Sequence, residues 1–134
     1  MTELFTFEIK THSKTDWLLI TSQIQIFVTS SNVKEGICTV FVPHTTAAVT
    51  INENADDDVP TDVNFALNAI SPDRREFRHN EGNSAAHTKS SLVGPSLTII
   101  VTNGKLLLGT WQGIWFCEFD GPRTRKVHVR IMGE

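Results

Sequence analysis

Apolar and polar residues alternate with a period of two over residues 5–10, which predicts a strand with one buried face. A second strand is predicted over residues 15–19. A nearly continuous apolar run at residues 37–42 predicts a strand buried on both faces, and residues 47–51 alternate again. Pro43 separates these last two strands, at a position where a proline indicates a sheet edge or a bulge.

Two other segments have the spacing of helices. Residues 21–31 contain many β-branched residues, which favour a strand, yet several apolar side chains share one helical face, so we predict a helix. Those side chains are Ile20, Ile24, Phe27 and Val28. A second helix is predicted up to Ile70, because apolar residues recur at helical spacing from Val59 onward, and Ser71-Pro72 ends it.

The last third of the chain is predicted to be sheet, after a long polar loop over residues 73–91. Asn103-Gly104 suits a two-residue hairpin turn, because both central positions of that turn need a positive φ. Many strands, two main helices and hairpin connections indicate an α+β fold with a curled, mostly antiparallel sheet, similar to a sandwich or barrel. The strands of this region are expected at residues 97–102, 105–108, 114–119 and 126–131.

The composition narrows the class of protein. The 134 residues are expected to form a single compact domain, 1–134, with an ordinary globular share of 40% hydrophobic residues. A net charge of −3 and scattered lysines and arginines argue against general nucleic-acid binding. No apolar run approaches the roughly 20 residues that cross a membrane, and the N-terminus lacks signal-peptide features, so a cytoplasmic location is expected. Cys38 and Cys117 are expected to be buried free thiols.

Three of the five histidines stand where functional groups concentrate. His44 follows the strand at residues 37–42, while His79 and His87 belong to the polar loop. Neutral imidazoles bind zinc and similar ions, and three of them with one open position make a catalytic type of site. The spacing of His79 and His87 matches no zinc signature, so the residues alone favour surface or capping histidines over a shared site. His12 and His128 are expected at the surface.

Carboxylates follow His44 closely in the chain. Asp56, Asp57 and Asp58 stand at the start of a predicted helix, where capping and the backbone dipole favour negative charge, which accounts for two of the three without a functional role. Glu53 comes before that helix. It could point toward His44 and orient the imidazole, act as a general base or hold a hard cation.

The segment LGTWQGIWFCEFDGPR, residues 108–123, interrupts an apolar strand pattern with polar groups. Trp111 and Gln112 could present an aromatic face and an amide to a ring-bearing ligand, although a tryptophan in the core fits equally well. Glu118 shares a strand face with apolar residues, so it must be either exposed or paired. Arg123, in a turn with Asp120, is a natural partner for a phosphate or a carboxylate.

Three segments together, PHTTAAVTINENAD, HNEGNSAAHTKSSLVGPS and LGTWQGIWFCEFDGPR, resemble the secondary thiamine-phosphate synthase enzyme family, the YjbQ-like proteins. The resemblance covers essentially the whole chain, and Gly-Thr-Trp-Gln-Gly is its specific signature. It implies a compact domain with a curled mixed sheet and a weak thiamine-phosphate synthase activity. It also implies a homotrimer with sites near the subunit interfaces and a metal at the histidines.

By motif position, the resemblance makes His44, His79 and His87 the candidate metal ligands. Zinc is the expected ion, and Mg²⁺ is a further possibility with a diphosphate substrate. Other candidate site residues are expected either to take part in catalysis or to bind the substrate. The catalytic candidates are Glu53, Gln112 and Asp120, and the substrate-binding candidates are Thr45, Asn83, Trp111 and Arg123.

Three functions are compatible with these residues. The first is coupling of a pyrimidine methyl diphosphate to a thiazole phosphate, with Arg123, Thr45 and a metal taking up the charge of the departing diphosphate. No glycine-rich phosphate cradle supports it, and the acidic helix start would repel a phosphate unless Mg²⁺ intervened. The second is a metal-dependent hydrolase of a small phosphorylated or carbonyl metabolite, with Glu53 or Asp120 as the base. The third is a trimeric metal- or ligand-binding protein without turnover.

Overall fold

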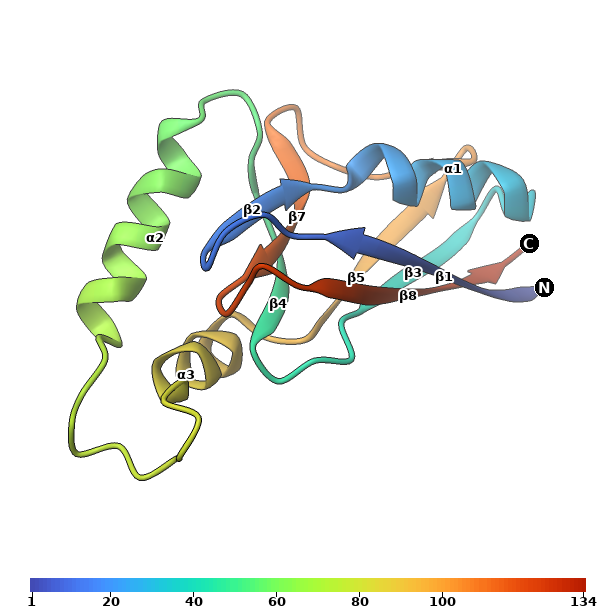
Figure 1. Cartoon of the computed structure of the whole chain (residues 1–134). Coiled ribbons are helices and arrows are strands. Elements are labelled where there is room, and N and C mark those ends of the chain that lie inside the picture. Colours follow the sequence, from blue (N-terminus) through green and yellow to red (C-terminus); the bar gives the residue numbers. More distant parts are fainter.

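In the computed structural model, which describes residues 1–134, the strands form two antiparallel sheets that curl into a half-barrel (Figure 1). The larger sheet has the strand order β1 (Thr2–Lys10), β8 (Thr124–Gly133), β3 (Gly36–Phe41), β5 (Ser96–Thr102) and β6 (Lys105–Leu106). The smaller sheet has the order β2 (Asp16–Leu19), β7 (Gln112–Glu118) and β4 (Ala47–Glu53). All strand pairs are antiparallel, which confirms the predicted α+β class.

Three helices accompany the sheets: α1 (Thr21–Ser31), α2 (Asp58–Ile70) and α3 (Ser84–Val93). The first two were predicted. The third corrects the prediction of a continuous loop over residues 73–91. Its sequence, SAAHTKSSLV, hides the helix because the side chains on its buried face are small or polar, so no apolar periodicity is visible. Those buried residues are Ala85, Ala86, Lys89 and Ser90.

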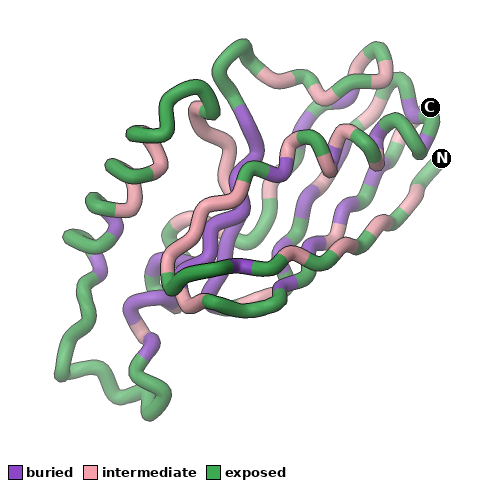
Figure 2. The backbone as a smooth tube through the Cα atoms, turned by 45° about the horizontal axis from the view of Figure 1, so that its top comes forward, coloured by how far each residue is buried: buried purple, intermediate pink, exposed green.

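The larger core lies between α1 and the sheets (Figure 2). Ile24 and Val28 of α1 pack in one cluster with Val40 of β3 and Val129 of β8, and all four are fully buried. Burying a side chain of this size contributes about 1.5–3 kcal/mol, so this cluster is the main source of stability. The packing also explains why tertiary contacts overrode the strand propensity of residues 21–31, because α1 buries only the face that was predicted.

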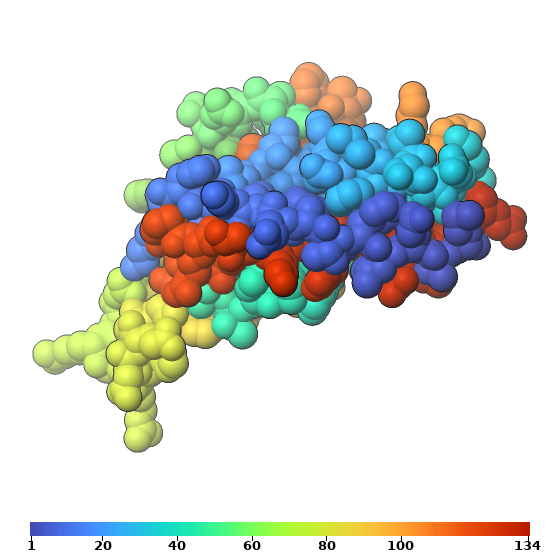
Figure 3. All heavy atoms as spheres, turned by 45° about the vertical axis from the view of Figure 1, so that its right-hand side comes forward, coloured from blue at the N-terminus to red at the C-terminus, as the bar shows by residue number.

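A smaller core lies on the opposite face of β7. Because side chains alternate along a strand, Phe116 points into the larger core, whereas Trp115 and Cys117 belong to the smaller cluster with Leu67 of α2 and Ala86 of α3. Leu67 is the only buried residue of α2, so this helix is mostly exposed. The segment between α2 and α3 projects from the body of the molecule (Figure 3).

Both cysteines are buried and free, as predicted. Burial raises the pKa of the Cys38 thiol to about 12 and also raises that of Cys117, so neither thiol is reactive at neutral pH. The predicted strand at residues 105–108 is shorter than expected and ends at Leu106. None of the helices combines the length and hydropathy that a membrane crossing would need.

Candidate functional site

One polar cavity of about 370 Å³ contains all three predicted histidines. We call it the histidine cavity. Its walls come from the connection between β3 and β4, from the loop that leads into α3, and from the start of β8 with the turn before it. Pro43 is the one lining residue without a polar side chain. The lining residues are Pro43, His44, Thr45, Thr46, His79, Glu81, Asn83, His87, Arg123 and Arg125.

Local structure explains how these distant segments meet. β3 ends at Phe41 and pairs with β8, whereas β4 begins at Ala47 in the other sheet, so the residues between them cross from one sheet to the other. α3 begins directly after Asn83, which places His87 in its first turn. The convergence depends on topology, and therefore the spacing of the histidines along the chain carried no signal.

His44 is oriented by the backbone of β8. Its Nε2 accepts a hydrogen bond of 2.9 Å from the Lys126 N–H, so in the neutral ring the proton lies on Nδ1. Burial lowers the pKa of His44, and the positive charge of Arg125 lowers it further, which favours the neutral ring. His44 is therefore prepared to donate a hydrogen bond from Nδ1 to a ligand.

His79 and His87 form the second part of the cavity. Their rings stand edge to face with centroids 5.3 Å apart, and His79 Nε2 lies 3.9 Å from Glu81 Oε1. The chain contains no group of three or more His, Cys, Asp or Glu side chains placed to hold a metal ion. Since His44 already uses Nε2, the three histidines share a cavity within one chain without forming a coordination sphere.

A buried ion pair between Glu118 and Arg125 forms the floor of the cavity. Glu118 was predicted to be either exposed or paired, but Arg125 was not identified as its partner. Arg125 donates from Nε to Glu118 Oε1 at 2.8 Å. Its Nη2 donates two further hydrogen bonds, one to Glu118 Oε2 and one of 2.8 Å to Thr46 Oγ1. Glu118 also accepts from Thr11 Oγ1 and the Asp120 N–H. Burial alone would raise the pKa of Glu118, but these hydrogen bonds, led by that from Arg125, hold the pKa below its ordinary value.

The alternation of side chains along the two strands could have revealed this pair. Glu118 follows Ile114 and Phe116 on the inward face of β7, and Arg125 precedes Val127 and Val129 on the inward face of β8. Two opposite charges on the buried faces of successive strands predict a buried ion pair, because burying either charge without a partner would cost too much free energy.

Asp120 holds two residues of the cavity wall. It accepts a hydrogen bond of 2.8 Å from Asn83 Nδ2 and one of 3.0 Å from Arg123 Nη2. Burial raises its pKa, but the hydrogen bonds from Asn83 and Arg123 outweigh burial and lower it below its ordinary value. Asp120 does not line the cavity itself, so its place fits a positioning residue better than the catalytic role that the sequence predicted.

Within one chain, the histidine cavity is not lined by Glu53, Trp111 or Gln112, which lie apart from it. Glu53 pairs with Gln112 at one end of the β4–β7 ladder, whereas Ala47 pairs with Glu118 at the other end, beside the cavity. The six residue steps between these ends span roughly 20 Å. The expectation that Glu53 stands beside His44 is therefore wrong for a single chain, because β4 carries Glu53 away from it.

The molecule is thus a small α+β protein with a polar, histidine-lined cavity at the junction of two curled sheets. Residues 5–134 match the family described as UPF0047 protein YjbQ-like, and the chain belongs to this family. It is 53% identical to a UPF0047 protein of Methanocaldococcus jannaschii over 131 residues, covering 98% of this chain and 95% of that protein. UPF0047 protein YugU of Bacillus subtilis is 49% identical, with 97% and 99% covered.

Solved structures of the same family share the fold. A YjbQ/UPF0047 protein of Clostridium acetobutylicum superimposes with a TM-score of 0.93 at 50% identity, covering 96% of this chain and 99% of that chain. A YbjQ-like protein of unknown function from Sulfolobus solfataricus gives a TM-score of 0.95 at 33% identity, with 100% and 99% covered. The fold is therefore kept where two thirds of the residues differ.

Proposed function

We propose that this chain is an enzyme acting on small phosphorylated metabolites, with the histidine cavity as its site and a thiamine-phosphate synthase type of transfer as its activity. The observation that carries the proposal is the meeting of three imidazoles and two guanidinium groups in one cavity whose lining side chains are polar except for Pro43. Such a lining suits a highly charged substrate, because phosphate oxygens need several hydrogen-bond donors.

The donors available to a phosphate come from three residues. Arg123 is half-exposed and uses Nε and one terminal nitrogen within the chain, which leaves further N–H groups for a ligand. His44 offers Nδ1–H, and Thr45 offers its hydroxyl. In the proposed transfer, the C–O bond to the diphosphate breaks, its electron pair leaves with the diphosphate, and the thiazole nitrogen forms the new C–N bond. Donors that face the departing oxygens stabilise the developing charge.

The proposal includes assembly into a homotrimer that completes the site. In the trimer, the histidine cavity of one copy would be reached by Glu53, Trp111 and Gln112 of a neighbouring copy. This arrangement would place the site near the subunit interface, as the family resemblance implies. Exposed apolar side chains support association, since Phe65 of α2 is 78% exposed and Trp111 is 63% exposed. In such an assembly, Gln112 and Trp111 would orient a ring and Glu53 would supply a base.

The second candidate function is a metal-dependent hydrolase of a small phosphorylated or carbonyl metabolite. It requires a divalent ion, and zinc is the first choice. The adjacency of His79 and His87 favours it, because two imidazoles already share one wall. A third ligand would have to come from a rotated His44 ring or from a neighbouring chain. A diphosphate substrate could instead bring Mg²⁺ with it.

The test is a transferase assay with the pyrimidine methyl diphosphate and thiazole phosphate, with the product separated by chromatography. Replacing Arg123→Gln should lower the rate at least about tenfold, because a charge-assisted contact to the leaving group is lost. Arg130→Gln, which removes the same charge from an exposed position on β8, is the matched control.

Two results would contradict the assignment as a transferase. Wild-type protein that makes no product, or an Arg123→Gln protein as fast as the Arg130→Gln control, overturns the assignment. Metal analysis of the same preparations tests the second candidate, the metal-dependent hydrolase. Zinc that is bound by wild-type protein and lost in His87→Ala would support a metal site. Rescue of a thiamine-phosphate synthase deletion at single-copy expression would show that the transfer is more than a side activity.

A further inference from the structure

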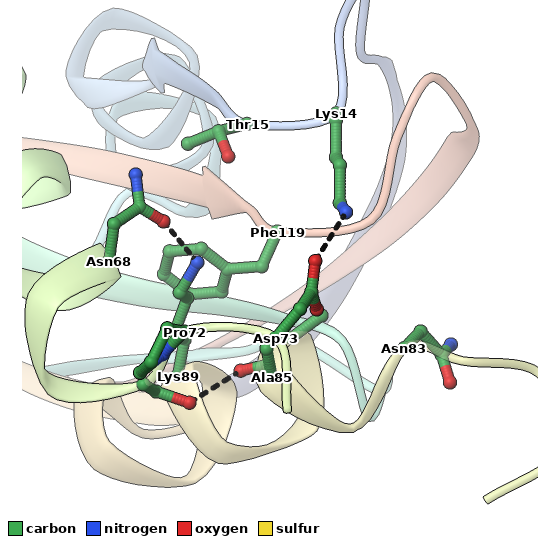
Figure 4. Close-up of a pocket in the computed structure, with 11 residues that line it drawn as sticks. Lys14, Thr15, Asn68, Pro72, Asp73, Asn83, Ala85, Lys89 and Phe119 are labelled. Atoms are coloured by element: carbon green, nitrogen blue, oxygen red, sulfur yellow. Dashed lines mark hydrogen bonds and ion pairs between the residues drawn. The ribbon is translucent and has the colours of Figure 1, made fainter. Parts of the chain in front are cut away.

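A second cavity lies on the other side of the first turn of α3 (Figure 4). Its volume is about 360 Å³, which is within the size of pockets for small metabolites. α3, the end of α2 and the turn between β1 and β2 form its walls. Asn83 lines both this cavity and the histidine cavity, but the two share no other lining residue.

Lys89 is the unusual group in this second cavity. It is only 8% exposed, although lysine is almost never so deeply buried without a charged partner. Its Nζ donates a hydrogen bond to Asn68 Oδ1, a neutral amide oxygen, and it forms no ion pair with any carboxylate of the chain. An ammonium has three donors, so two remain for another partner.

The other charges around the cavity do not compensate Lys89. Asp73, the lining carboxylate, lies with its Oδ2 3.8 Å from Lys14 Nζ, and both of these side chains are largely exposed at the mouth. Figure 4 shows the Lys14–Asp73 pair on one side and the Lys89–Asn68 pair on the other. Two ammonium groups thus face one carboxylate, which leaves the cavity with one unmatched positive charge.

Burying a charge against a neutral partner costs free energy that a methionine of similar size would not require. Lys89 ties α3 to α2 through Asn68, but an uncharged donor could make the same bridge. The charge itself, the two unused donors and the adjoining open volume all point to a negatively charged partner.

We propose that this second cavity binds a small anion, through a carboxylate or phosphate group that accepts hydrogen bonds from Lys89 Nζ, with Lys14 at the mouth as a second positive charge. The site is separate from the histidine cavity and does not depend on the function proposed for it. Charge-assisted hydrogen bonds in a partly desolvated cavity supply the affinity.

The experiment is a titration of ¹⁵N-labelled protein with inorganic phosphate and, separately, with glycolate, followed by amide chemical shifts. Ala85 and Ala86 report on the second cavity, and Thr45 and Thr46 report on the histidine cavity. Wild-type protein should show saturable shifts at the first group with at least one of the two anions. The anion that binds more tightly identifies the head group.

Two variants of the second cavity make the result decisive. Lys89→Met should weaken binding at least about tenfold, because it removes the charge-assisted donors. Asn68→Asp keeps Lys89 but gives it a carboxylate partner, and it should weaken binding similarly while preserving the fold. Lys105→Met removes an exposed lysine of β6, far from both cavities' linings, and should leave these shifts unchanged.

The proposal is overturned if neither anion shifts Ala85 or Ala86 in wild-type protein. It is also overturned if both Lys89→Met and Asn68→Asp bind the anions as wild type does, which would make Lys89 a purely structural residue. Shifts confined to Thr45 and Thr46 would assign the anion to the histidine cavity alone and would equally contradict the second site.

Discussion

Two carboxylate–guanidinium pairs stand close together at the histidine cavity, and they differ mainly in burial. The side chains of Glu118 and Arg125 are 0% and 6% exposed, whereas those of Asp120 and Arg123 are 18% and 49% exposed. The Glu118–Arg125 pair joins the end of β7 to β8, and the Asp120–Arg123 pair lies within the turn between these strands. The same chemistry therefore occurs once inside the core and once at the surface.

The difference in burial gives the two arginines different capacities. Glu118 and Arg125 are hydrogen-bonded on both sides by neighbours such as Thr11 and Thr46, so separating them would leave buried charges unpaired. The side chain of Arg123 is held only by Asp120 and is half-exposed, so it can turn toward an incoming anion at small cost. Arg125 thus stiffens the floor of the cavity, and Arg123 is free to contact a ligand.

The largest effect is expected when the buried pair loses one member. Arg125→Leu should lower the free energy of unfolding by about 3–5 kcal/mol, because Glu118 would stay buried without its partner. Urea denaturation followed by circular dichroism measures this change. The double variant Glu118→Leu/Arg125→Leu should recover part of the loss, since no isolated charge remains, and a double variant that is less stable than both single ones would contradict the argument.

Acid should weaken both pairs. The pKa of Glu118 is lowered in the folded protein from an ordinary value of 4.5, and that of Asp120 is lowered from 3.8. The folded state therefore binds these protons less readily than the unfolded chain, so stability is present above pH 4.5 and is lost as the pH falls through the folded pKa values. Urea midpoints measured from pH 6 to pH 2.5 test this, and Glu118→Gln should show a shallower loss than wild type over that range.

The smallest effect on stability is expected for the exposed pair. Arg123→Gln should change the free energy of unfolding by less than about 1 kcal/mol, because water and counter-ions already screen this contact. The same urea experiment measures it beside Arg125→Leu. Equal losses in the two variants would mean that burial does not separate the two pairs, and Arg123 would then have to be regarded as part of the floor.

Local pattern predicted most of the fold. Period-two alternation identified β1, and the shared apolar face identified α1 against its β-branched composition, because both patterns are read from residues only a few positions apart. α3 was not predicted, because the same local patterns are missing there. Its buried face carries Ala85, Ala86 and Lys89, and small or charged side chains on an inner face leave no apolar stripe to detect.

The candidate site was predicted in part. His44, His79 and His87, with Thr45, Asn83 and Arg123, share one cavity, and Asp120 stands directly behind it. Glu53, Trp111 and Gln112 were expected in the same place, but they lie at the far end of the β4–β7 ladder. Motif position shows which residues are unusual, whereas the length and direction of a strand determine which of them meet.

The sequence by itself determined the α+β class, the first two helices, the buried free thiols and the identity of the polar residues worth examining. Only the tertiary structure decided that three histidines share a cavity without a coordination sphere, that Arg125 and Glu118 pair beneath them, and that Lys89 lies buried in a second cavity. The physical reason is range. Secondary structure follows from interactions between near neighbours, whereas a site is formed by side chains that the strands carry together from distant parts of the chain.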